Sequence, residues 1–199
     1  VKADAFDAET HHDTSLYHSV DWRCGTPELL PDEPLIPMAP HPPEILAAPA
    51  PEVHLGDIAQ FFTHIPEQLV KGTCIAIGEH IYIYIENSVR NVISEAEAQE
   101  IAVEFDSRIY PQVHRWIGTE WKPGLDRDGR VTLLMHDVGA NGSSQGFGGY
   151  FSSTDERPTD FNSNRREIIF MDVFLFRERP RLTFYSSLAH EFTHLVNWY

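Results

Sequence analysis

The sequence predicts an α/β (α+β) fold from about residue 71 onwards, on three observations. Apolar residues alternate with tyrosines in residues 74–87, at the two-residue period of a strand. Residues 94–110 repeat apolar positions at helical spacing. Three more apolar β-type runs then precede a helical stretch, so the expected order is strand, helix, three strands, helix.

The first helix is predicted over residues 94–110. Ser94 followed by Glu97 is a capping box, which satisfies two backbone amides at a helix start. Pro111 lacks a backbone donor and should kink or end the helix. Its apolar face consists of Ala98, Ile101, Phe105 and Ile109.

Three β-type runs follow, at residues 131–138, 146–153 and 166–176. The last helix is predicted over residues 183–199, with Thr183 or Ser186 as its N-cap. One stripe of this helix should pack on the sheet: Leu188, Phe192, Leu195 and Tyr199.

The composition divides the chain in two. Nine of its 14 prolines lie between Pro27 and Pro51, a density that favours extended chain over helix or sheet. We expect residues 1–70 to be a proline-rich N-terminal extension or pro-segment. The formal charge of −15 argues against nucleic acid and anionic membrane surfaces as partners. No apolar run approaches the roughly 20 residues that a membrane-spanning helix needs, and no signal peptide is visible.

The last predicted helix carries His190, Glu191 and His194, the H-E-x-x-H pattern of zinc peptidases. Histidines four residues apart lie on one face of a helix, so both imidazoles can reach one ion. Glu191 can polarise a zinc-bound water and carry its proton to the leaving amine. The pattern predicts a Zn²⁺ site with two histidine ligands and Glu191 as general base.

Several blocks in residues 71–199 resemble secreted bacterial zinc metallopeptidases. The chain is most similar to the hyicolysin-like group and more distantly similar to immune inhibitor A proteases. The blocks are EFDSRIYPQVHRWIGTEWKPGLDRDGRVTLLMHDV, GFGGYFSS, SNRREIIFMDV and SSLAHEFTHLVN.

The resemblance implies a zincin, in which a twisted mixed sheet with a backing helix and an active-site helix forms the upper half of a cleft. It implies an extracellular, bacterial zinc endopeptidase that acts on protein or peptide substrates. An extended substrate would add to the edge strand at Gly148, Gly149, Tyr150 and Phe151.

A catalytic zinc normally takes three protein ligands, and this helix supplies two. In a metzincin pattern Asn197 would stand at the glycine position and the third ligand would be residue 200. The hyicolysin-like resemblance favours a glutamate further downstream. We therefore expect residues 71–199 to be an upper subdomain truncated after the zinc helix, inactive alone and completed by a downstream subdomain. The alternative is a non-catalytic zincin-like module that binds a partner in a larger assembly.

Cys24 lies in DWRCGTPELL, which resembles the cysteine switch of matrix metalloproteinase pro-segments. A thiolate at the zinc would displace the catalytic water and keep a zymogen silent. The other interpretation is a disulfide between Cys24 and Cys74, the chain's two cysteines, as secretion would favour. Of the two, the disulfide is the narrow preference.

The stretch GLDRDGR resembles the start of a calcium loop at Asp126, Asp128 and Gly129. The position of the closing carboxylate falls on Met135, which cannot bind Ca²⁺. A turn with solvated charges is the expected structure, and Ca²⁺ is only a secondary expectation beside Zn²⁺.

Overall fold

The computed structural model describes residues 23–29, 50, 52–139, 142 and 146–198. Its strands form one seven-stranded sheet in the order β1-β6-β7-β5-β4-β3-β2. The sheet is mixed, because β4, β5 and β7 pair in parallel while β2–β3, β3–β4 and β6–β7 pair antiparallel. The strands are β1 (Arg23–Cys24), β2 (Ile58–His64), β3 (Glu67–Ile77), β4 (Ile81–Glu86), β5 (Val131–His136), β6 (Phe147–Phe151) and β7 (Ile168–Asp172).

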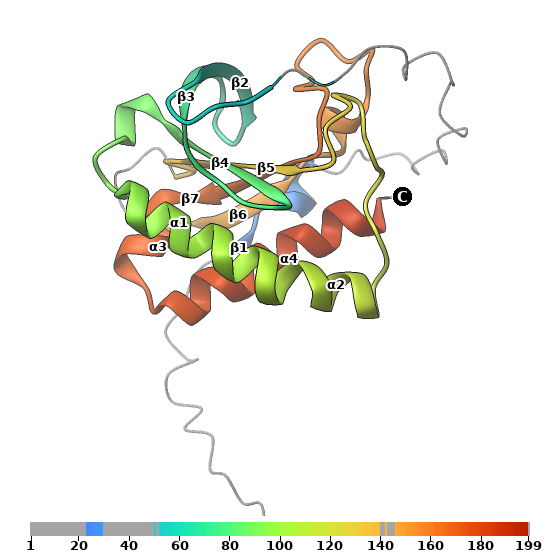
Figure 1. Ribbon diagram of the computed structural model, residues 1–199. Coiled ribbons are helices and arrows are strands. Elements are labelled where there is room, and N and C mark those ends of the chain that lie inside the picture. The colour runs from blue at the N-terminus through green and yellow to red at the C-terminus, as the bar shows by residue number, and fades with distance from the viewer. Residues whose placement is uncertain (1–22, 30–49, 51, 140–141, 143–145, 199) are drawn as a thin grey trace, which may run out of the picture.

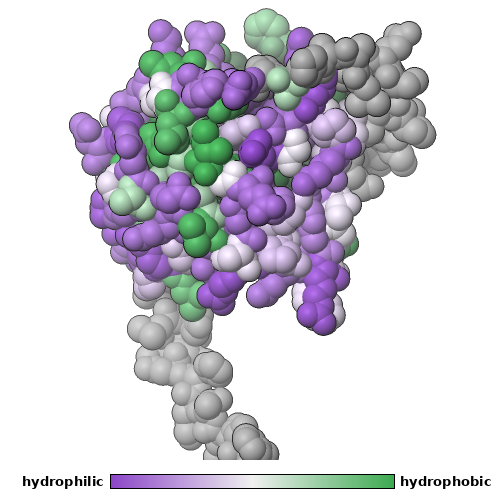
Figure 2. Space-filling model, viewed as in Figure 1, coloured by the Kyte–Doolittle hydropathy of each residue, from purple (hydrophilic) through white to green (hydrophobic). Residues whose placement is uncertain are grey.

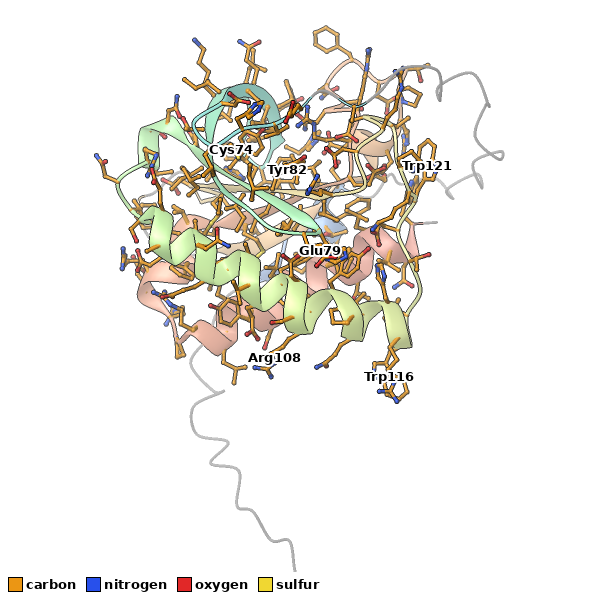
Figure 3. All side chains as sticks on the ribbon, viewed as in Figure 1. Cys74, Glu79, Tyr82, Arg108, Trp116 and Trp121 are labelled. Carbon is orange, nitrogen blue, oxygen red and sulfur yellow. The ribbon has the colours of Figure 1, made fainter. Side chains whose placement is uncertain are left out.

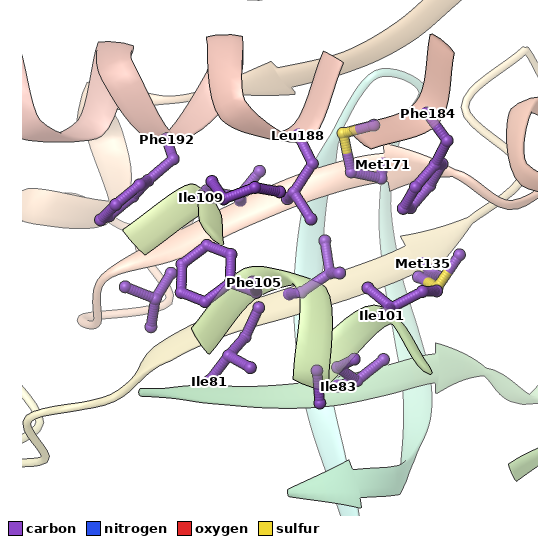
Figure 4. Close-up of a cluster of buried hydrophobic side chains, with 14 of the residues drawn as sticks. Ile81, Ile83, Ile101, Phe105, Ile109, Met135, Met171, Phe184, Leu188 and Phe192 are labelled. Carbon is purple, nitrogen blue, oxygen red and sulfur yellow. The ribbon is translucent and has the colours of Figure 1, made fainter. Parts of the chain in front are cut away.

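The main helices lie on one side of this sheet (Figure 1). A larger core fills the space between them and the sheet. In it, Phe105 and Phe192 from two different helices meet with ring centroids 5.1 Å apart (Figure 4). The helical elements are 3-10 helices η2 (Thr26–Leu29), η4 (Asn87–Val89) and η6 (Ser153–Glu156), the π-helical turn η5 (Phe105–Ile109), and α1 (Glu95–Glu104), α2 (Tyr110–Trp116), α3 (Val173–Glu178) and α4 (Arg181–Asn197).

A second core lies on the other side of the sheet, where β2 and β3 curl over it (Figure 1). Tyr150 of β6 is fully buried here and stacks on Phe170. Its hydroxyl accepts hydrogen bonds from the backbone amides of His64 (3.0 Å) and Ile65 (3.4 Å), at the end of β2. The curl thus joins two strands that are far apart in the order of the sheet.

The mixed α/β fold agrees with the fold class expected from the sequence, and the capping box of Ser94 and Glu97 is confirmed. Pro111 does not end the helix. The π-helical turn η5 precedes it and α2 continues through it, because a wider turn accommodates the missing donor and the bulky ring.

Three expected elements differ from the structure. Residues 74–87 are not one strand, because the chain turns at Gly78 between β3 and β4. The run 166–176 is only half strand, since the Asp172 side chain accepts from the Phe174 amide and starts α3. Neither Thr183 nor Ser186 caps α4, whose N-cap is Pro180.

The expected domain boundary between residues 70 and 71 falls inside β3, and β1 adds residues 23 and 24 to the same sheet. The apolar stripe of α4 is confirmed for Leu188, Phe192 and Leu195, while Tyr199 lies outside the described residues. In the described part of the chain no helix is long and apolar enough to cross a membrane. The face in Figure 2 is mostly hydrophilic, with small apolar areas between.

Candidate metal centre

Helix α4 places the three residues of the H-E-x-x-H pattern beside the edge of the sheet that β1 and β6 form. The Nε2 atoms of His190 and His194 are 3.0 Å apart, so the two imidazoles converge on one point. His190 is exposed and His194 is partly buried, whereas Glu191 is completely buried. The two histidine side chains are thus at least partly exposed to solvent, whereas the Glu191 carboxylate is buried in the protein.

The close approach of α4 to β6 depends on Gly149. A Cβ at this position would lie 3.3 Å from Cγ of Glu191, 2.5 Å from Sδ of Met171 and 2.7 Å from the carbonyl oxygen of Phe170. No side chain fits there without a shift of backbone. Gly149 thereby lets Glu191 lie directly against the strand.

Cys24, on β1, completes the cluster. Its Sγ lies 3.6 Å from Nε2 of His194 and 3.5 Å from Oε2 of Glu191. The ligand atoms of Cys24, His190, Glu191 and His194 all lie within 4.8 Å of one another. In the described part of the chain, no other group of three or more histidine, cysteine or acidic residues is arranged so that it could hold a metal ion.

These distances fit the donor set of a zinc ion. A sulfur and a nitrogen bound to one tetrahedral zinc lie about 3.6 Å apart, and two such nitrogens about 3.3 Å apart. The observed sulfur–nitrogen and nitrogen–nitrogen distances are 3.6 and 3.0 Å. Thiolate and imidazole are also the ligand types that zinc prefers.

The expected disulfide between Cys24 and Cys74 is not formed, and both cysteines are free. The reason is the order of the sheet. Four strands separate β1 from β3, where Cys74 lies (Figure 3), and strands are spaced about 4.8 Å apart, whereas a disulfide bridges Cα atoms at most about 7 Å apart. Cys74 is buried, and its thiol donates to the carbonyl oxygen of Ala76 at 3.7 Å.

Burial governs the protonation of the site. It raises the pKa of Glu191 to about 7, against the opposing effect of hydrogen bonds from Cys24 and Thr26. Burial, followed by the nearby charge of Glu191, raises the pKa of the Cys24 thiol to about 11. Burial and the neighbouring His190 lower the pKa of His194. His194 is therefore a neutral imidazole at pH 7, which is the form that binds a metal.

Thr26, which the sequence did not single out, also contacts this centre. Its hydroxyl donates to Oε2 of Glu191 at 3.0 Å and accepts from the amide of Phe151 at 2.8 Å. The residue is 5% exposed. Its position two residues after Cys24 is the only signal in the sequence. That signal can be interpreted only when Cys24 is known to lie beside His190 and His194.

The four predicted substrate-binding residues, Gly148, Gly149, Tyr150 and Phe151, lie on β6. The outer side of this strand pairs with β1, in parallel, and the amide of Gly25 donates to the carbonyl oxygen of Gly149 at 2.8 Å. Gly25 fits tightly there, since a Cβ would lie 2.8 Å from Cδ1 of Ile65 and 3.1 Å from Cβ of Tyr150. The Tyr150 side chain points into the second core, so only its backbone is available at the edge.

The stretch around Asp126 and Asp128 is a turn, as expected, but both carboxylates are partly buried and bonded within the protein. Asp126 accepts from the amide of Asp128 at 3.0 Å, and Asp128 accepts from the Tyr82 hydroxyl at 2.7 Å. Arg130 pairs with Asp128 at 3.6 Å. Protein donors thus engage both carboxylates, and nothing in this geometry supports Ca²⁺.

One comparison with known proteins bears on the family of the chain. The chain is 33% identical over 114 residues to the "Neutral metalloprotease ShpI" of Staphylococcus hyicus. This match supports a metalloprotease family. The match covers 54% of this chain and 25% of the relative, so the chain spans about a quarter of the relative's length. No protein-family model matches the chain.

Proposed function

We propose that the protein is a zinc-dependent endopeptidase in which Glu191 is the general base. The observation that carries this proposal is the meeting of His190, His194 and a buried Glu191 beside the outer edge of β6. The likeness to a metalloprotease supports it independently of the geometry. A strand edge next to a metal-binding helix suits an extended peptide, which adds to a sheet by backbone hydrogen bonds.

Zinc held by His190 and His194 would supply a Lewis acid that polarises the scissile carbonyl and acidifies water. Glu191 accepts the proton of the attacking water and passes it to the leaving amine. The backbone of β6 aligns the substrate along the site.

In the described conformation the proposed enzyme is latent. The Cys24 thiol lies where a thiolate would bind zinc with the two histidines, and it contacts Glu191. Zinc lowers the pKa of a coordinating thiol enough to deprotonate it. We propose that Cys24 keeps the catalytic position closed and that a ligand from a downstream subdomain completes the active site. The protein is proposed to act outside the cell, on protein or peptide substrates.

The test is Glu191→Gln in the full-length protein after removal of its N-terminal segment. The variant should keep its zinc yet lose peptide hydrolysis by about 100- to 10,000-fold, the usual contribution of a general base. Glu178→Gln, on the exposed end of α3, is the matched control and should behave as the parent. Measured zinc content and hydrolysis rates decide the outcome.

Activity of Glu191→Gln within tenfold of the parent would rule out Glu191 as the base. A parent protein that binds zinc firmly but hydrolyses no peptide would instead favour the alternative, a non-catalytic binding module. Loss of zinc from a His190→Ala variant separates a genuine metal site from a fortuitous pair of histidines.

A further inference from the structure

The segment from Cys24 to Thr26, here called the strap, contacts the candidate site in more ways than through its thiol. Besides Cys24, the strap includes Gly25, whose amide bonds to Gly149, and Thr26, whose hydroxyl bonds to Glu191 and to the Phe151 amide. The Cys24 contact would involve the metal. The Thr26 contact involves the base and the strand edge, neither of which needs a metal.

The Thr26 hydroxyl group makes two hydrogen bonds at the same time, one as donor and one as acceptor. It donates its single proton to Glu191 at 3.0 Å and accepts from Phe151 at 2.8 Å, as a hydroxyl with one O–H and two lone pairs can. Thr26 is 5% exposed and Glu191 is fully buried. Water cannot easily replace a partner at such a place, so loss of the hydroxyl would leave buried polar groups unsatisfied.

The strap also occupies the outer edge of β6. The carbonyl oxygen of Gly149 and the amide of Phe151 are the backbone groups through which an added strand would pair, and the strap engages both. Yet β1 pairs with β6 over two residues only, with an irregular register between them. So short a ladder holds little by itself, and the side chains of Cys24 and Thr26 must contribute much of the attachment.

We propose that the strap inhibits through two separable contacts, in which Thr26 holds Glu191 and the substrate edge independently of the bond between Cys24 and the metal. This inference rests on the proposed function. It implies that loss of the thiol alone leaves the protein largely latent. Full activity requires that the strap leave β6 altogether.

The experiment uses the unprocessed full-length protein and four variants: Cys24→Ala, Thr26→Val, the double variant and Thr26→Ser. Valine keeps the shape of threonine without the hydroxyl, and serine keeps the hydroxyl. Thr73→Val is the matched control, because it also loses a hydroxyl bond, 2.7 Å to Oδ1 of Asn87, on the distant strand β3. Zinc-dependent peptide hydrolysis is the first readout.

The second readout needs no activity. Amide hydrogen exchange at Gly25 and Phe151 is measured in zinc-free protein, which cannot cleave itself by the proposed mechanism. Thr26→Val should speed exchange at both amides about tenfold or more, as expected for a lost hydrogen bond to a buried charged or polar group. Thr26→Ser and Thr73→Val should exchange as the parent does.

In hydrolysis, Cys24→Ala should remain at least about tenfold less active than the double variant. The proposal is wrong if Cys24→Ala alone is as active as the double variant, or if Thr26→Val leaves exchange at Phe151 unchanged. If the parent protein hydrolyses no peptide even after removal of its N-terminal segment, the proposed function fails. The exchange measurement still decides whether Thr26 holds the strap.

Discussion

At one edge of the sheet, β2 pairs with β3 over seven residues from Ile58 to His64, whereas at the other edge β1 pairs with β6 over two. The first pairing is local, since a turn at Ile65 and Pro66 joins the two strands. The second joins Cys24 to Gly149, far along the chain, and the side chains of Cys24 and Thr26 beside it contact the candidate metal centre.

The difference separates a permanent edge from a replaceable one. The hairpin edge has a long ladder and a fully buried Phe61 that packs edge-on against Tyr84. Loss of the hairpin edge would therefore destabilise the fold. The strap edge has a short ladder and specific polar contacts, and β6 also pairs with β7, so under our proposal the strap can leave while β6 stays in place.

The largest effect is expected at the permanent edge. Phe61→Ala should lower the free energy of unfolding by about 3–5 kcal/mol, because it leaves a cavity in the second core. Ile58→Ala on the same strand is the control, since Ile58 is 64% exposed and its loss should change little. Denaturant unfolding measures both. A loss below 1 kcal/mol for Phe61→Ala would mean that the hairpin edge is no more essential than the strap.

A second comparison uses one glycine from each side. Gly149→Ala should cost about 1–3 kcal/mol through overpacking, because a Cβ would lie 2.7 Å from the backbone oxygen of Phe170. Gly72→Ala on β3 should cost less, since its nearest contacts, at 3.0 to 3.2 Å, are side-chain atoms of Phe61 and Leu134 that can yield. Unfolding free energies that show equal losses would contradict this view of how closely α4 packs on β6.

The third prediction contrasts Glu191 with Glu167, a buried carboxylate away from the strap. The Leu125 backbone and the Glu156 side chain lie near the Glu167 carboxylate. Burial, followed by the charge of Asp126, raises its pKa from 4.5 to about 8. Because the folded state then binds the proton more tightly than the unfolded state, this group destabilises the fold increasingly as pH rises from about 4.5 to 8.

Glu167→Gln removes that cost. The variant should match the parent near pH 4 and exceed its unfolding free energy by at least about 1 kcal/mol above pH 8, where the penalty is complete. Thermal or denaturant unfolding across this pH range provides the measurement. A difference that does not grow with pH would show that the Glu167 carboxyl is not held neutral by burial.

The smallest effect is expected at the start of α1, remote from both edges. Ser94→Ala removes the side-chain acceptor for the Glu97 amide and should cost about 1 kcal/mol. Glu97→Gln keeps an acceptor for the Ser94 backbone amide but loses the ion pairs with Arg177 (3.0 Å) and Arg181 (3.1 Å), so it should cost no less. Unfolding measurements that found no loss for Ser94→Ala would make this capping box irrelevant to stability.

Local signals in the sequence predicted much of the fold. The capping box at Ser94, the alternation from Ile81 to Ile85 and the stripe from Leu188 to Leu195 each depend on neighbours within a few residues, and the structure has these features. The convergence of His190 and His194 follows from one turn of helix. The predicted ends of helices and strands were wrong where a single residue overrides the apolar pattern. Asp172, for example, starts helix α3 inside an apolar run.

The partner of Cys24 could not be predicted in this way. A choice between Cys74 and the histidines depends on which strand β1 joins, and that pairing spans more than a hundred residues. The role of Thr26 depends on the same placement. Periodicity and spacing carry no record of such long-range contacts, so the sequence left two alternatives for Cys24 and none for Thr26.

Gly25 sets a limit on what can pass along β6. It lies between the Ile65 side chain, at the tip of the β2–β3 hairpin, and Tyr150, with room for a hydrogen atom but not for a methyl group. A segment with a larger residue at this point can follow the same path only after Ile65 rotates away. The hairpin tip therefore limits the size of any residue that lies at this point beside α4, and the glycine of the Cys-Gly-Thr sequence is small enough to fit there.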